Sequence, residues 1–191
     1  MILYHGRMQA AGAPLLGLFC CASSLESIWK LSLKSDTALK PDTASLSFAE
    51  LKLKPDTLAN LDSLGYTQMT PIQANSLPII LQGEDIIAKA KTGSGKTAAF
   101  GLGLLESVDA KQFVTQSLVL CPTRELAEQV AKEIRRLGRA IPYLKVLTLC
   151  GGVSKRPQTA SLEQHSPHIV VGTPGRILDH LQKNTLKLGR I

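Results

Sequence analysis

One eight-residue stretch constrains the fold of this chain more than any other: Ala90-Lys91-Thr92-Gly93-Ser94-Gly95-Lys96-Thr97. It follows an apolar, strand-like segment and opens a helix-like one, which is the setting of a phosphate-binding loop. Gly93 and Gly95 allow a tight turn, and the N–H groups at the helix start face the phosphates. Lys96 would reach the β- and γ-phosphates, and the Thr97 hydroxyl would hold Mg²⁺. A Gly/Ser-rich turn without a ligand is the alternative, but it does not require Lys-Thr directly after Gly.

A second element of such a site, an apolar strand that ends in an acid, is missing after the loop. Three later apolar runs lead into Pro122, Gly151 and Gly172 instead. Asp109 and Asp179 are the only aspartates beyond the loop, and neither ends an apolar run. The sequence therefore predicts half of a nucleotide-hydrolysing site.

Composition indicates a globular chain with a polyanionic partner. Of its 191 residues, 44% are hydrophobic and 19% are charged, and the net charge is +7. An apolar run at 10–22 is too short to span a membrane and lacks a signal-peptidase pattern. We expect residues 1–45 to be a poorly ordered or non-native leader. The spacing of the cysteines does not fit a metal site, so free thiols are predicted for Cys20, Cys21, Cys121 and Cys150. Free thiols are typical of a reducing compartment, and a cytoplasmic location is therefore predicted for the chain.

From Phe48 onward, helical and strand-like segments alternate, which predicts a parallel sheet flanked by helices. In such α/β folds, ligands gather at the carboxyl ends of the strands. A short irregular or helical piece is expected at 157–164. The remaining segments are predicted as helices at 55–64, 70–81, 96–107, 124–137 and 175–183, and as strands at 85–90, 117–121, 145–149 and 168–172.

Several motifs at the segment ends each have an ordinary structural explanation. Thr70-Pro71-Ile72-Gln73 fits a capping box, with Thr at the N-cap, Pro at N1 and Gln at N3. Thr123 and Thr173 fit N-caps after strands. The same residues, with a nearby arginine and N–H groups at adjacent strand ends, would also form a phosphate track. Gly151-Gly152 would let a nucleic-acid backbone approach closely.

In their order and spacing, these motifs together resemble the first RecA-like lobe of DEAD-box RNA helicases. The resemblance covers about residues 46 to 191. It rests on Phe48 and five short motifs: Gly65 to Gln73, Ala90 to Thr97, Pro122 to Leu126, Gly151-Gly152, and Thr173 to Arg176. It implies a partial RecA-like P-loop domain, truncated before its last strands, with ATP and Mg²⁺ as cofactors and RNA as partner.

The resemblance also implies residue roles. Gln73 would read the adenine edge, and Phe48 or Tyr66 would stack near the base. The loop 90–97 would bind the phosphates, with Lys96 and Thr97 catalytic and Thr97 on the metal. Within the family, the likeness is greatest to bacterial members that select ribosomal RNA through a further domain. Contacts to the RNA backbone, independent of base sequence, are implied for Pro122, Thr123, Arg124, Gly151, Gly152, Thr173, Gly175 and Arg176.

The chain departs from the family in the elements that it lacks and in one altered segment. It lacks the Asp-Glu-Ala-Asp and Ser-Ala-Thr elements and the second helicase lobe, so the isolated chain is expected to be inactive. Val153 to Pro157 adds two positive charges where the family has a Gly-rich segment. Two other interpretations stay open: another P-loop NTPase or small-molecule kinase, which would need an arginine-bearing lid and an acidic site, or a non-catalytic nucleotide- and RNA-binding fragment.

Overall fold

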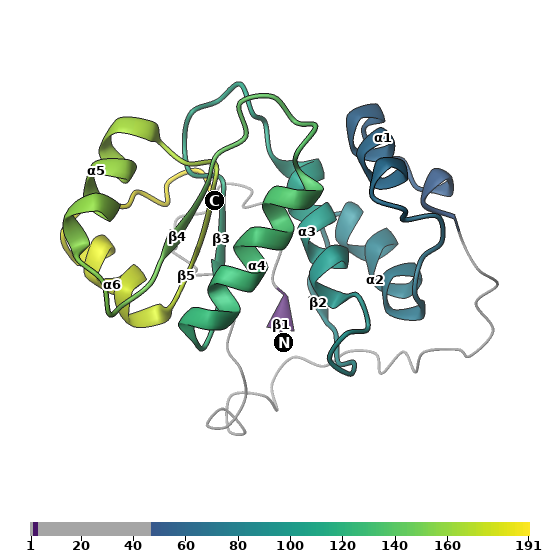
Figure 1. The fold of residues 1–191 in the computed structure, drawn as a ribbon, viewed down its shortest axis with the longest axis horizontal. Helices are drawn as coiled ribbons and strands as arrows, with labels where there is room; N and C mark the ends of the chain where they lie inside the picture. Colours follow the sequence, from purple (N-terminus) through teal and green to yellow (C-terminus); the bar gives the residue numbers. More distant parts are fainter. Residues whose placement is uncertain (1, 4–46) are drawn as a thin grey trace.

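A computed structural model describes residues 2–3 and 47–191 of the chain (Figure 1). The expectations for the leader fall on residues outside that description, apart from Ile2 and Leu3. Among the described residues, every helix is too short or too polar to cross a bilayer.

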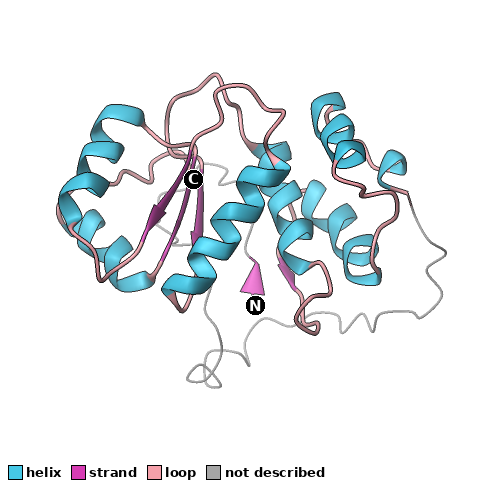
Figure 2. Ribbon diagram, viewed as in Figure 1, coloured by secondary structure: helices cyan, strands magenta, loops and turns pink. Residues whose placement is uncertain are grey.

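A three-stranded parallel sheet forms the centre of the domain (Figure 2). Its strands are β3 (Ser117–Leu120), β4 (Val146–Leu149) and β5 (Ile169–Gly172), in the order β3-β5-β4. Ile169, Val170 and Val171 are fully buried in the central strand, as expected for a strand covered on both faces. All three strands end level at Leu120, Gly172 and Leu149. This common edge carries the motifs that follow the strands.

Helices cover the sheet and build a second layer beside it. α4 packs on β4 and β5 through an apolar face, and α3 packs between α4 and α2 (Figure 1). Gly101 and Gly103 allow this close packing, because a Cβ at Gly101 would press on Leu137 and one at Gly103 would collide with Ile80. The helices are α1 (Pro55–Ser63), α2 (Pro71–Leu81), α3 (Lys96–Ser107), α4 (Arg124–Leu137), α5 (Lys155–His165) and α6 (Pro174–Gln182), with a 3₁₀ turn η2 (Phe48–Glu50).

The strand predicted at 85–90 is wrong in extent and in pairing. β2 comprises only Ile86–Ile87 and pairs antiparallel with β1 (Ile2–Leu3). Within the described residues it has no ladder to the three-stranded sheet. The apolar pattern located this segment, but a strand exists only where a neighbour completes its hydrogen bonds. Ala88 is buried and yet lies beyond the ladder.

A buried histidine fixes the opposite, amino-terminal ends of the strands. His168 is fully buried, and its Nδ1 accepts the Lys145 backbone N–H at 3.0 Å. The Phe113 ring lies 5.6 Å from the imidazole. Burial, and then the Lys145 charge, lower the pKa of His168. The neutral imidazole is therefore the form that the fold selects.

The sign of this pKa shift predicts acid sensitivity. An unfolded histidine titrates near pH 6.5, so below that pH the unfolded chain binds more protons than the folded one. The contribution of His168 is present above about pH 6.5 and is lost as the pH falls. Urea midpoints measured from neutral to mildly acidic pH should fall, and less steeply in His168→Asn. His165→Asn, at an exposed histidine, is the matched control. An unchanged pH profile in His168→Asn would contradict this assignment.

Candidate nucleotide and nucleic-acid site

The loop at 90–97 has the backbone shape that phosphate binding requires. Gly93 and Gly95 have φ angles of +80° and +90°, a region open mainly to glycine. Gly95 is the N-cap of α3 and offers no side chain to its free N–H groups. The N–H groups of Lys96 and Thr97 therefore remain available to an anion at the helix start.

Lys96 places its charge inside this loop. Its ammonium donates hydrogen bonds to the carbonyl oxygens of Ala90 and Lys91 and lies 3.4 Å from the Ser94 hydroxyl. An ammonium held among carbonyl oxygens can exchange them for phosphate oxygens, which bind it more strongly. The structure thus places the Lys96 ammonium close to Ala90, Lys91 and Ser94 of the loop, and the phosphate-binding role of residues 90–97 stays a prediction.

Thr97 fits part of a magnesium site. Its hydroxyl makes no hydrogen bond to any residue of the described part of the chain, and it lies one residue beyond Lys96 in the first turn of α3. Among the described residues, there is no cluster of three or more histidines, cysteines or acids that could hold a metal. Mg²⁺ commonly binds through few protein ligands together with phosphate oxygens and water. One hydroxyl beside a phosphate site suits that role.

Helix α2 is hydrogen-bonded to the phosphate-binding loop through its first turn. The Thr70 hydroxyl donates to the Ser94 carbonyl at 2.9 Å, and the Gln73 amide donates to the Gly95 carbonyl at 3.2 Å. Gln73 Oε1 accepts the Thr70 backbone N–H at 2.9 Å, which is the predicted capping box. Gln73 is only 2% exposed. One residue therefore caps α2 and holds the loop, and its reading of adenine stays a prediction.

The two predicted stacking aromatics contact each other. The Phe48 ring is buried and meets Tyr66 edge-on, with the centroids 6.1 Å apart. The Tyr66 hydroxyl donates to Glu133 Oε1 at 3.0 Å, and the Arg136 guanidinium lies over its ring. Burial, and then Glu133, raise the pKa of Tyr66. The two rings thus contact each other, Tyr66 is also engaged with α4, and base stacking by either ring stays a prediction.

The residues predicted to contact RNA gather at the carboxyl edge of the sheet. Thr123 caps α4, its hydroxyl accepting the Leu126 N–H at 3.3 Å. Arg124 Nη1 donates to the Gly151 carbonyl at 3.3 Å, and a Cβ on Gly152 would collide with the same guanidinium. Pro122, Thr173 and Gly175 follow β3 and β5 at this edge, and a Cβ on Gly175 would meet open space.

Arg176 does not lie on this surface as the motif suggested. It is 7% exposed, and its guanidinium donates to Gln158 Oε1 at 2.6 Å and to the Val153 carbonyl at 2.9 Å. Gln158 in turn donates to the Cys150 carbonyl at 3.1 Å, and His180 Nε2 lies 3.4 Å from Gln158 Oε1. Arg176 therefore supports the Gly151-Gly152 loop from beneath, and direct contact with RNA stays a prediction.

Gln158 is the residue at this site that the sequence did not single out. A glutamine inside a polar helix gives no signal of its own. Its importance comes from burial between α5, α6 and the loop after β4, which only the tertiary structure reveals.

The two buried cysteines at the strand ends are unsuited to nucleophilic chemistry. Both Cys121 and Cys150 are free and buried. Burial raises the pKa of Cys121 to about 11 and also raises that of Cys150. Only a thiolate is a good nucleophile, so these thiols are structural.

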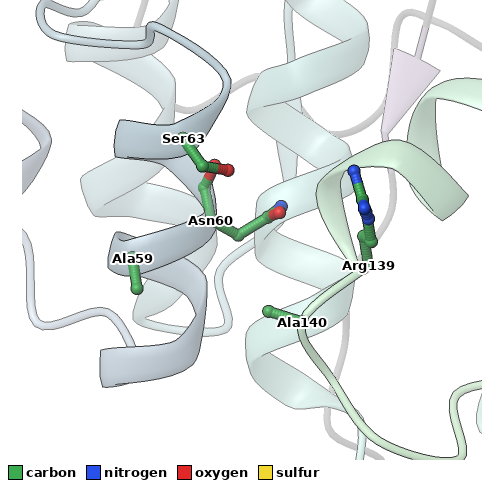
Figure 3. A pocket seen from close by; sticks show the side chains of 5 residues that line it. All are labelled: Ala59, Asn60, Ser63, Arg139 and Ala140. Carbon is green, nitrogen blue, oxygen red and sulfur yellow. The ribbon is translucent and has the colours of Figure 1, made fainter.

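A shallow cavity of about 260 Å³ is lined by none of the predicted site residues (Figure 3). It lies between α1 and the turn after α4. The Asn60 amide donates to the carbonyls of Leu137 and Arg136 at 2.6 and 3.1 Å and so caps the end of α4. The lining thus serves helix packing, and its residues are Ala59, Asn60, Ser63, Arg139 and Ala140.

Comparison with known proteins agrees with this arrangement. The family model described as DEAD/DEAH box helicase matches residues 70–191. The chain belongs to the DEAD/DEAH box helicase family.

Curated relatives of this helicase domain are RNA helicases by name. "ATP-dependent RNA helicase DbpA" of Escherichia coli is 64% identical over 136 residues, covering 71% of this chain and 30% of that protein. "DEAD-box ATP-dependent RNA helicase CshA" of Bacillus cereus is 47% identical over 145 residues, covering 76% and 27%. The chain thus spans less than a third of the length of these relatives.

Solved structures of DEAD-box proteins have the same fold. A DEAD box protein from Methanococcus jannaschii is 40% identical with a TM-score of 0.71, covering 78% of this chain and 40% of that chain. S. cerevisiae Dbp5 bound to RNA and ADP BeF3 is 29% identical with a TM-score of 0.68, covering 76% and 36%. The predicted RecA-like α/β class, as a partial domain, is confirmed.

Because α2 packs closely on the phosphate-binding loop, we expect substitutions at the two loop glycines to differ in their effect on stability. A Cβ on Gly95 would meet Gln73 Nε2 at 2.6 Å and Thr70 Oγ1 at 3.1 Å, whereas one on Gly93 would meet nothing within 4 Å. Both positions have positive φ, so alanine is strained at each. Gly95→Ala should lower the free energy of unfolding by about 1–3 kcal/mol more than Gly93→Ala, measured in urea. Equal losses in the two variants would contradict the contact.

Proposed function

We propose that this chain is the ATP-binding and RNA-binding part of an ATP-dependent RNA helicase. The observation that carries the proposal is the joint placement of two sites on adjoining helices. The phosphate-binding loop starts α3, and the predicted RNA residues Thr123 and Arg124 start α4. α3 and α4 pack together through Gly101 and Leu137. We therefore expect a displacement of the start of α3 to change the position of the start of α4.

ATP is the proposed nucleotide, with Lys96 and the N–H groups of α3 on its phosphates. Mg²⁺, held by Thr97 and the phosphates, would neutralise charge that develops during phosphoryl transfer. Gln73 is proposed to read the adenine edge, because it lies beside the loop that would hold the phosphates. The relatives named as ATP-dependent RNA helicases support this choice of nucleotide.

RNA is the proposed partner of the sheet edge. Arg124 supplies a positive charge, and Gly151 and Gly152 present backbone without side chains. Contacts of this kind fix a sugar-phosphate backbone but do not distinguish bases, so binding by this domain should be independent of sequence. A preference for ribosomal RNA, and action in the cytoplasm, are proposed for the longer protein from its likeness to DbpA.

Nucleotide titration of the purified chain tests the proposal. ATP should bind more tightly than GTP or CTP, and Lys96→Ala should weaken ATP binding about tenfold or more, because it removes a charge-assisted contact. Lys132→Ala, at an exposed lysine on α4, is the matched control and should leave affinity unchanged. Equal binding of all three nucleotides, unaffected by Lys96→Ala, would refute the proposed site.

A further inference from the structure

The segment that follows Gly151-Gly152 contains cations whose surroundings differ. The Lys155 ammonium is 2.6 Å from Asp179 Oδ2, and Arg176 Nε approaches the same oxygen at 3.9 Å. The Lys155 side chain, through its hydrogen bond, lowers the pKa of Asp179. The Asp179 carboxylate beside this segment is thus already paired with Lys155 and lies close to Arg176.

Arg156 is the third cation, and its side chain is exposed. Within the described part of the chain, no hydrogen bond, ion pair or ring contact of its guanidinium is recorded; only its backbone N–H bonds to Ser154 Oγ, at 3.4 Å. The helix offers no partner either, because positions i+3 and i+4 are Thr159 and Ala160. Arg156 therefore carries an uncompensated charge.

Helical geometry directs Arg156 away from the domain interior. Successive residues of an α-helix are rotated by about 100°, so Arg156 lies on the side of α5 opposite to Gln158. Gln158 is buried against the Cys150 carbonyl and Arg176. The first turn of α5 therefore presents Arg156 to solvent, shortly after the exposed Gly152 and Val153 in the sequence.

The base from which Arg156 extends is fixed. The loop before α5 has three of its carbonyl oxygens bound by side chains: Gln158 on Cys150, Arg124 on Gly151 and Arg176 on Val153. These three bonds tie the loop to α5, α4 and α6. An arginine at the end of a held loop loses less conformational freedom on binding than one on a mobile loop.

We propose that Arg156 binds a phosphate of single-stranded RNA and extends the contact surface of Arg124, Gly151 and Gly152. The inference rests on the proposed RNA-binding function. A phosphate is the fitting ligand because the guanidinium is exposed, lacks a carboxylate partner and adjoins backbone that carries no side chain. Its contribution is one further ionic contact, felt equally by all RNA sequences.

Salt dependence of RNA binding tests this contact. The full chain is titrated against a fluorescent oligouridine at several salt concentrations, and log Kd is plotted against log salt. Arg156→Gln should weaken binding several-fold at low salt and reduce the slope by about 0.7, the value for one contact to a single strand. Arg156→Lys keeps the charge and should retain most of the slope. Arg190→Gln removes an equal charge from an exposed arginine beyond α6 and should leave the slope unchanged.

The outcomes separate the two proposals. If the unsubstituted chain binds RNA and Arg156→Gln has the same slope and affinity, the role of Arg156 is overturned while the RNA-binding function stands. If Arg190→Gln lowers the slope as much as Arg156→Gln does, the effect is one of net charge and the assigned contact is overturned. Failure of the unsubstituted chain to bind RNA would overturn the proposed function and this inference together.

Discussion

Two hydrogen bonds from the first turn of α2 to the phosphate-binding loop determine the geometry on which the rest of the site depends. Thr70 and Gln73 donate to the carbonyls of Ser94 and Gly95, the two residues directly before α3. Gln73 is almost fully buried, so water competes little for its bond. Where α3 begins determines where Lys96 and Thr97 lie. A motif whose simplest explanation is a helix cap therefore also positions the phosphate ligands.

The predicted RNA edge depends on a comparable set of hydrogen bonds from side chains to loop carbonyls. Gln158 and Arg176 hold the loop after β4 from beneath, and Arg124 holds it from the start of α4. The loop can therefore expose Gly152 without losing its shape. In both the phosphate-binding loop and the loop after β4, side chains donate hydrogen bonds to loop carbonyls. Other backbone groups of each loop stay available to a ligand. The helices α3 and α4, which begin at the two edges, pack against each other at Gly101 and Leu137.

Local patterns in the sequence predicted most of the fold. The bounds of α3 and α4, expected at 96–107 and 124–137, agree with the structure, because each helix starts after a strand-to-loop transition and α4 also has apolar residues spaced along one face. Three strands fell within one residue of their predicted ends. These features depend on neighbours in sequence, and so the sequence alone contains them.

What the sequence could not predict depends on partners distant in the chain. β2 is two residues long because its ladder is set by another segment, here Ile2–Leu3. The burial of Arg176 follows from Gln158 and Val153, which approach from α5 and the loop before it. The motif around Arg176 identifies its place at the strand end but not the direction of its side chain. The same holds for Phe48 and Tyr66, which contact each other, and for the contact of Tyr66 with α4.

Amide hydrogen exchange in Gln73→Ala measures most directly whether α2 holds the phosphate-binding loop. The Ser94 N–H donates to the Lys91 carbonyl and the Ala99 N–H to the Gly95 carbonyl, so both report on the loop and the start of α3. If Gln73 holds the loop, the substitution should speed exchange at both amides about tenfold, the effect of losing one hydrogen bond. The Ala131 amide in α4 should be unaffected. Unchanged exchange at Ser94 and Ala99, or equal acceleration at Ala131, would contradict the account.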